Sequence, residues 1–274
     1  METIRGRTAF ITGGASGIGL GIAEALVAKG ARVVLADWNE LSLERESAKL
    51  GSAVLAQRFD VRDRAGWQMA KEVTEDRFGP VDILVNNAGL APGRYQLVDM
   101  PGEYFDRLVA IMLTGVFNGV LTFGAGMRER GDGHIVNTAS MAGLLASPGH
   151  GAYTAAKFAV VGLSEALRAE LAPYGVGVTV LCPGLVRTNI GLNDIEERIL
   201  PGADDRSILD GAMDPAIVAA RVVNSIRHDD PFILTHVDDR IALERRANLL
   251  LRAVDLASNP ASRLAQQLDD LPGT

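Results

Sequence analysis

Residues 8–37 read TAFITGGASGIGLGIAEALVAKGARVVLAD, and this stretch decides the fold. It begins with a short apolar run, 8–12, and continues with a glycine-rich segment, 13–19. An amphipathic helical pattern follows and stops at Gly30, and a second apolar run, 32–37, ends in an acid. The order predicts strand, loop, helix and strand, which is the βαβ unit from which parallel sheets are built.

The glycine-rich segment has the features of a loop that binds a dinucleotide. Gly13 permits a tight turn, Gly17 lets the backbone approach a pyrophosphate, and Gly19 allows the helix to pack closely on the strand. The helix that follows offers free N–H groups and the positive end of its dipole to the phosphates. The spacing is Gly-x-x-x-Gly-x-Gly rather than Gly-x-Gly-x-x-Gly, and an ordinary turn is the competing interpretation.

Asp37 bears on the choice of cofactor. It follows Gly19 by eighteen residues, close to the spacing of an acid that accepts from the ribose 2′- and 3′-hydroxyls. A carboxylate here repels a 2′-phosphate, and the loop 13–19 contains no arginine or lysine that would attract one. The sequence therefore favours NAD over NADP. In the competing interpretation, Asp37 caps the next helix.

Apolar runs and helical patterns alternate along the rest of the chain. The predicted strands cover about 8–12, 32–37, 53–58, 81–85, 133–140, 176–181 and 231–235. This pattern predicts an α/β fold of the Rossmann type, a doubly wound parallel seven-stranded sheet with helices on both faces. We expect one domain over 1–274, with a substrate loop at about 189–213 and a C-terminal helical extension at about 238–258.

Composition and charge narrow the classes of function. The 274 residues are 47% hydrophobic and carry a net charge of -7 without a basic stripe, which disfavours a nucleic-acid partner. Cys182 is the single cysteine, so no internal disulfide can form, and we predict no metal site. The sequence has no run of about 18 apolar residues and no apolar core near its N-terminus. We therefore expect no membrane span, no signal peptide and a cytoplasmic protein.

Three further residues have the chemistry of a proton-transfer site. Ser140 ends an apolar run that reads as a buried strand, and Tyr153 and Lys157 lie near the start of the next helical pattern. Residues four apart share a helix face, so the ammonium should favour the phenolate and lower the pKa of Tyr153 from about 10. Ser140 should open into the crevice where parallel sheets bind ligands. Taken alone, such a tyrosine–lysine pair is more often surface decoration.

Together these motifs resemble the short-chain dehydrogenase/reductase family over about residues 5–190. The matching segments are Thr12–Gly19, Asp37, Asp60-Val61, Asn86–Gly89, Ser140, Tyr153-x-x-x-Lys157 and Pro183–Thr188. The resemblance implies that these residues bind the cofactor: Gly13, Ser16, Gly17, Ile18, Gly19, Asp37, Trp38, Asp60, Val61, Asn87, Ala88, Gly89, Tyr153, Lys157, Pro183, Gly184, Val186 and Thr188. Within this set, Asp60 and Val61 would flank the adenine, and Thr188 would bind the nicotinamide carboxamide.

The resemblance also implies a catalytic set, Ser140, Tyr153 and Lys157. Ser140 would hydrogen-bond the substrate oxygen, Tyr153 would exchange a proton with it, and Lys157 would depress the pKa of Tyr153 and bond the nicotinamide ribose. We therefore predict an NAD-dependent oxidoreductase that interconverts a hydrophobic secondary alcohol, including an aromatic one, and its ketone by hydride transfer. Because family members are commonly dimers or tetramers, we expect a homodimer or homotetramer.

The sequence departs from the family pattern in two places. Met112 stands where the family usually has an asparagine linked to a water that relays protons to the lysine, and Asn118 should point to another face. Many members end soon after the seventh strand, whereas 238–258 is predicted to be helical. This ending resembles that of a subgroup oxidising bulky, often aromatic or benzylic, secondary alcohols, including Cα-dehydrogenases acting on lignin-derived aryl ethers.

Two alternative functions stay open at this point. One is an NADP-dependent carbonyl reductase. The other is a weakly active or inactive NAD-binding sensor or scaffold on the same fold, which Met112 motivates. The predicted substrate wall, drawn from 90–95, 141–150 and 185–213, is mostly apolar, so we expect a small hydrophobic alcohol or ketone as substrate.

Overall fold

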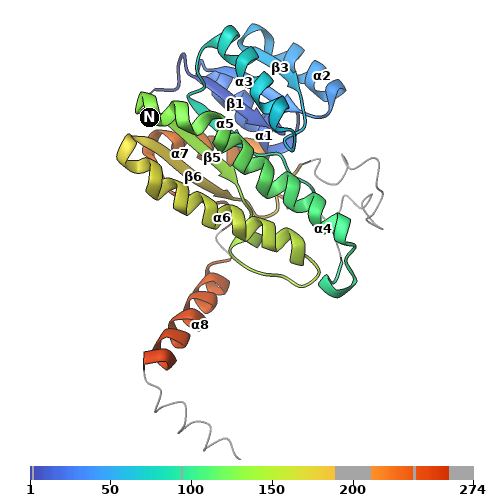
Figure 1. The fold of residues 1–274 in the computed structure, drawn as a ribbon, viewed down its shortest axis with the longest axis vertical. Coiled ribbons are helices and arrows are strands. Elements are labelled where there is room, and N and C mark those ends of the chain that lie inside the picture. The colour runs from blue at the N-terminus through green and yellow to red at the C-terminus, as the bar shows by residue number, and fades with distance from the viewer. Residues whose placement is uncertain (2, 94, 189–210, 237–238, 259–274) are drawn as a thin grey trace, which may run out of the picture. The chain divides into compact units, whose positions relative to one another are not determined.

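A parallel sheet organises the first 235 residues of the chain (Figure 1). In the computed structural model, which describes residues 1, 3–93, 95–188, 211–236 and 239–258, this sheet has seven strands in the order β3-β2-β1-β4-β5-β6-β7. The strands are β1 (Thr8–Thr12), β2 (Arg32–Asp37), β3 (Val54–Arg58), β4 (Ile83–Asn86), β5 (Gly133–Thr138), β6 (Val176–Cys182) and β7 (Phe232–Leu234). The predicted seven-stranded parallel α/β fold is confirmed.

Helices cover both faces of this sheet (Figure 1). They are α1 (Gly17–Ala28), α2 (Glu40–Leu50), α3 (Arg64–Phe78), α4 (Gly102–Val109), α5 (Gly115–Arg130), α6 (Gly151–Leu171) and α7 (Pro215–His228). The strand order reverses between β1 and β4, and ligands of doubly wound sheets bind at such a switch point, outside the carboxyl ends of the strands.

Strand residues alternate between two core layers, as the two-residue period of a strand requires. Ile11 of β1 lies in a cluster with Leu26 of α1 and Val222 of α7. Its neighbour Phe10 lies in the opposite layer, with ring centroids 5.6 Å from Trp67 of α3 and 5.1 Å from Phe123 of α5. Because both faces are covered, the central strands are almost continuously apolar, as parallel sheets generally are.

The long helical pattern around 103–130 is interrupted by a π-helical turn. The chain runs from α4 through this turn, Ala110–Thr114, into α5. Within the described residues, Gly102–Arg130 is the one helical segment long and apolar enough to cross a membrane by length and composition. The segment includes Leu108 and Met112, which are fully buried, and packed core helices of folded proteins pass the same test of length and composition.

The chain divides into two units, Met1–Thr235 and His236–Thr274. The second unit contains α8 (Arg240–Ser258), in which Arg240 donates to Glu244 one turn later at 2.7 Å. The prediction of a single domain over 1–274 stays a prediction. Most of the predicted substrate loop at about 189–213 lies outside the described residues, which resume at Gly211.

Candidate active site

Polar contacts fasten the carboxyl ends of β1, β4 and β5 to one another. The Thr12 hydroxyl accepts from the backbone N–H groups of Asn87 at 2.9 Å and Ala88 at 3.1 Å. The side-chain amide of Asn87 donates to the carbonyl oxygens of Thr12 and Gly13, at 3.2 and 3.3 Å. The Thr138 hydroxyl in turn donates to Asn87 Oδ1 at 3.3 Å. Thr12 and Thr138 were not predicted as site residues, and a hydroxyl at a strand end was the signal available.

The glycine loop can adopt its shape only with glycine at particular positions. Gly13 and Gly17 have φ angles of 62° and 53°, in the region that favours glycine. A Cβ on Gly19 would lie 2.2 Å from the Gly13 carbonyl oxygen, and one on Gly17 would lie 2.9 Å from Thr188 Cβ. The loop therefore meets the segment 183–188, and α1 begins at Gly17 with its free N–H groups at the loop.

The segment 183–188 is held from several sides. The Pro183 carbonyl accepts from the backbone N–H of Met141 at 2.9 Å, and the Gly184 N–H donates to the Thr235 hydroxyl at 2.9 Å. Further along, the Arg187 N–H donates to the Met213 carbonyl at 2.9 Å. Sequence reasoning did not find Thr235, because its partner lies 51 residues away.

Asp37 lies at the carboxyl end of β2 and accepts two backbone hydrogen bonds. Its donors are the N–H groups of Ala15, at 3.2 Å, and Asn39, at 3.1 Å. Burial raises the pKa of Asp37, and these hydrogen bonds act against that increase. The cap of α2 is Asn39, which accepts from the N–H of Ser42 at 3.0 Å. The alternative in which Asp37 caps this helix is therefore wrong.

The turn after β3 carries the two residues predicted at the adenine. Both carboxylate oxygens of Asp60 accept from Arg62, at 2.5 to 3.0 Å. Burial raises the pKa of Asp60, but the hydrogen bonds from Arg62 outweigh it and the pKa is lowered. Val61 is half-buried, while Trp38, which the resemblance assigns to the ribose, is largely exposed.

Ser140, Tyr153 and Lys157 come together where β5 meets α6. Lys157 is buried and donates from Nζ to the Thr138 carbonyl at 2.8 Å. Its ammonium lies 5.7 Å from the centre of the Tyr153 ring. Ser140 hydrogen-bonds Tyr153 and also accepts from the Ala142 N–H at 3.1 Å. The three predicted catalytic residues thus form one cluster.

The pKa of Tyr153 differs from the sequence-based expectation. Burial raises it, and the hydrogen bond with Ser140 opposes that increase without overcoming it. Burial also lowers the pKa of Lys157 to about 8. The lysine lies over the tyrosine ring face, and desolvation disfavours the charged forms of both groups. The predicted lowering of the Tyr153 pKa by Lys157 is therefore not seen in this structure.

Met112 lies in an apolar cluster beside the same tyrosine. Its side chain is fully buried with Leu108, Ala152 and Ala156, and Tyr153 packs against them. Asn118 lies in the next turns of the helix and hydrogen-bonds the Val61 carbonyl instead. This agrees with the expectation that Asn118 faces elsewhere.

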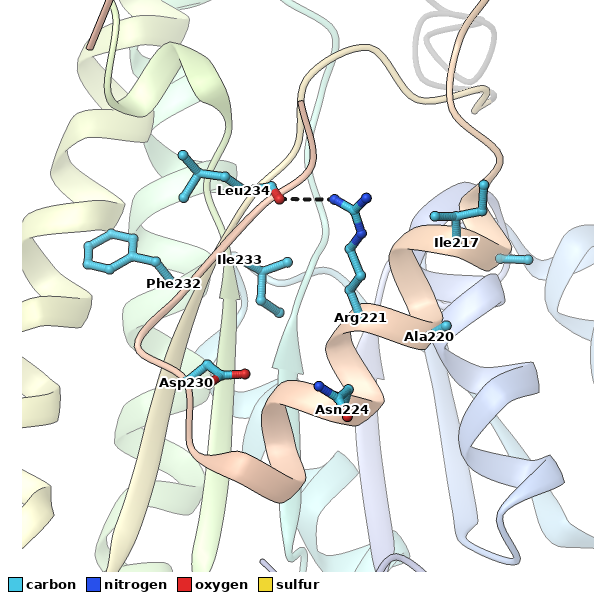
Figure 2. A pocket seen from close by; sticks show the side chains of 9 residues that line it. Ile217, Ala220, Arg221, Asn224, Asp230, Phe232, Ile233 and Leu234 are labelled. Atoms are coloured by element: carbon cyan, nitrogen blue, oxygen red, sulfur yellow. Dashed lines mark hydrogen bonds between the residues drawn. The ribbon is translucent and has the colours of Figure 1, made fainter. Parts of the chain in front are cut away.

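A groove of about 760 Å³ lies between α7 and the edge strand β7 (Figure 2). Figure 2 shows Arg221 reaching from α7 to the Leu234 carbonyl, at 3.0 Å, and the same nitrogen also donates to the Thr235 carbonyl at 3.0 Å. None of the residues that line this groove is a predicted site residue. The groove is therefore distinct from the predicted site.

Comparisons with known proteins agree with this geometry. The family model described as short chain dehydrogenase matches residues 7–198. The chain is 38% identical over 193 residues to 3beta-hydroxysteroid dehydrogenase 2 of Eggerthella lenta, covering 69% of this chain and 74% of that protein.

Two solved structures extend the similarity beyond sequence. A short chain dehydrogenase/reductase from Burkholderia phymatum in complex with NAD is 32% identical with a TM-score of 0.84, covering 92% of this chain and 97% of that one. The apo form of LigO from Sphingobium sp. strain SYK-6 is 33% identical with a TM-score of 0.82, covering 100% of both chains. The resemblance seen in the motifs is thereby confirmed, and the chain belongs to the short-chain dehydrogenase/reductase family of oxidoreductases.

Proposed function

We propose that this protein is an NAD-dependent alcohol dehydrogenase that interconverts a hydrophobic secondary alcohol and its ketone. The observation that carries the proposal is the cluster in which Ser140 hydrogen-bonds Tyr153 while buried Lys157 lies over the tyrosine ring. Membership of an oxidoreductase family supports it, as does a solved relative in complex with NAD.

The residues around the switch point fit a dinucleotide. The loop 13–19 offers glycine backbone at its tight positions and the N-terminus of α1, which suits a pyrophosphate. The Asp37 carboxylate, at the end of β2, suits the adenosine ribose and disfavours a 2′-phosphate. The fastened segment 183–188 would hold the nicotinamide, and Lys157 would bond its ribose. Preference for NAD over NADP is part of this proposal.

The catalytic steps follow from the proton chemistry of the cluster. NAD, when bound, supplies the acceptor for the hydride that leaves the alcohol carbon. Tyr153, as phenolate, removes the hydroxyl proton, and Ser140 donates a hydrogen bond to the same oxygen. In the reverse direction, the phenol of Tyr153 protonates the ketone oxygen as hydride reaches the carbon. Lys157, when protonated, stabilises the phenolate.

The described part of the predicted substrate wall is mostly aliphatic, with one aromatic ring, that of Tyr95. The Tyr95 ring contacts that of Tyr104 of α4 in a tilted arrangement, with centroids 5.1 Å apart. Tyr104 and Leu90 pack, as Tyr153 does, against the apolar cluster around Met112. A β-bridge joins Tyr95 to His150, just before α6. Such a wall favours a bulky apolar substrate, including an aryl or benzylic alcohol.

We also propose that the protein assembles as a homodimer or homotetramer in the cytoplasm. β7 ends the sheet, and beside it Ile217 and Leu234 are 49% and 37% exposed on the groove of Figure 2. An edge strand with apolar neighbours is a common site of association between copies. Sedimentation equilibrium of the purified chain tests this part, and a monomer at micromolar concentration would contradict it.

The proposed activity is tested with a panel of secondary alcohols, from aliphatic to benzylic, offered with NAD or with NADP. We expect the absorbance of reduced cofactor to appear with NAD, and most rapidly with the apolar alcohols. Faster turnover with NADP would favour the carbonyl-reductase alternative instead. Tight NAD binding without turnover of any alcohol would favour the sensor alternative, whose basis is the apolar Met112 beside Tyr153.

A further inference from the structure

The turn after β3 is fastened by side chains from two helices. The Val61 carbonyl oxygen accepts from the indole N–H of Trp67, in α3, at 2.9 Å. It also accepts from the side-chain amide of Asn118, in α5, at 3.0 Å. A carbonyl oxygen has two lone pairs, so these donors saturate it and fix the direction in which the peptide points.

Both polar atoms of the Asn118 side-chain amide have hydrogen-bond partners. It is 1% exposed, and its Oδ1 accepts from Arg64 Nε at 3.0 Å while its nitrogen donates to Val61. A 180° flip of the Asn118 amide would place its oxygen against the Val61 carbonyl oxygen and its N–H groups against the Arg64 guanidinium. Only one orientation therefore satisfies both neighbours.

Helix α5, which carries Asn118, also has a glycine where it packs against the turn after β3. A Cβ on Gly115, three residues earlier, would lie 2.8 Å from Val61 Cγ2. The glycine thus lets the valine side chain approach the helix, and the asparagine secures its carbonyl. Both contacts come from a segment of chain more than 50 residues away from the turn.

We propose that Asn118 is a positioning residue for the adenine half of the cofactor. This inference rests on the proposed function, in which Asp60 and Val61 flank the adenine. Asn118 acts through Val61: it holds the turn in one conformation before the cofactor arrives, so less conformational entropy is lost on binding. We expect its contribution to appear in affinity for the adenosine moiety and not in the hydride-transfer step.

The substitution Asn118→Asp tests the hydrogen bond from the Asn118 side chain to the Val61 carbonyl. The carboxylate keeps the shape and the Arg64 partner, which holds it ionised, but it cannot donate to Val61. We expect the Kd for AMP, measured by calorimetry, and the KM for NAD to rise roughly tenfold, because one buried hydrogen bond is lost and an oxygen faces another oxygen. The kcat at saturating NAD stays within about twofold of wild type. Gly115→Ala, which pushes on Val61 from the side, should raise the Kd for AMP in the same way.

Ser164→Ala is the matched control. Ser164 is fully buried and accepts from Asn137 at 2.9 Å, so its loss also removes a buried hydrogen bond. We expect it to lower the melting temperature with no change in the Kd for AMP. If Asn118→Asp and Gly115→Ala likewise lose stability but keep the wild-type Kd for AMP, Asn118 is merely structural and the inference is overturned. Wild-type protein that binds neither AMP nor NAD would overturn the proposed function together with it.

Discussion

Asp37 is the residue on which the proposed preference for NAD over NADP rests. Its carboxylate is held by the N–H groups of Ala15 and Asn39 at the end of β2, so it cannot easily move away from a ligand. Arg58 is its register partner in β3 and forms an ion pair with Glu40 at 3.6 Å. The Arg58 cation is thus near, but it is the Asp37 carboxylate that lies at the predicted position of the ribose.

Replacing this acid should therefore change cofactor preference. We expect Asp37→Ser to shift the ratio of kcat/KM for NADP over NAD by at least about 100-fold toward NADP, because bringing like charges together costs several kcal/mol. Asp37→Glu keeps the charge and serves as the control, which should still discriminate against NADP. An unchanged ratio in Asp37→Ser would show that another group sets the preference.

At the scale of elements, the π-helical turn is the feature that local sequence patterns could not provide. The pattern around 103–130 predicts a helix, and a helix is found, but the turn at 110–114 depends on how α4 and α6 pack. Helix α7, by contrast, begins with signals that the local sequence contains: Asp214 accepts from the Ala216 N–H at 2.9 Å as its cap, and Pro215 stands at its first position. Local signals of this kind mark the start of a helix, here at Pro215.

Some residues of the candidate site could likewise be predicted from local sequence patterns, and others could not. The glycine loop follows from spacing within one βαβ unit, and the i,i+4 spacing places Tyr153 and Lys157 on one helix face. That Ser140 joins them in a catalytic set came from the resemblance to the family. Asn118 and Thr235 contact partners 57 and 51 residues away, and no local pattern reports such pairs. The raised pKa of Tyr153 also depends on burial, which only the assembled structure provides.

The π-helical turn yields a prediction for Met112. We expect Met112→Asn to lower the free energy of unfolding by roughly 1–3 kcal/mol, because its amide would be buried among Leu108, Ala152 and Ala156 without a partner. Urea denaturation beside Met112→Leu, a swap that keeps the site apolar, measures the difference. Equal stability of the asparagine and leucine variants would instead mean that a polar partner, such as the relay water of the family, is available there.

At the scale of the whole molecule, His134 links the sheet to the far end of α7. Its Nε2 lies 2.8 Å from the Thr179 hydroxyl, which donates to the Asp230 carbonyl at 2.7 Å. The imidazole is 1% exposed, and burial lowers its pKa to about 4. The folded protein therefore keeps His134 neutral at a pH where the unfolded chain is already protonated.

This difference makes stability depend on pH. Because the folded pKa is below the unfolded value of 6.5, the stabilisation is complete above pH 6.5 and is lost as the pH falls toward 4. We expect the free energy of unfolding to drop by up to about 3 kcal/mol over this range on account of His134 alone. Urea denaturation at several pH values should show a shallower dependence in His134→Gln. Parallel curves for the two proteins would refute the assignment.

The central claim is that Tyr153 exchanges the proton of an alcohol while NAD accepts its hydride. The most direct measurement compares the initial rate of NAD reduction by wild type and Tyr153→Phe, with the best alcohol of the panel and with saturating NAD. We predict that kcat falls roughly 1000-fold, as loss of a general acid–base group implies, while the Kd for NAD changes less than about tenfold. A Tyr153→Phe variant that reduces NAD at the wild-type rate would contradict the claim.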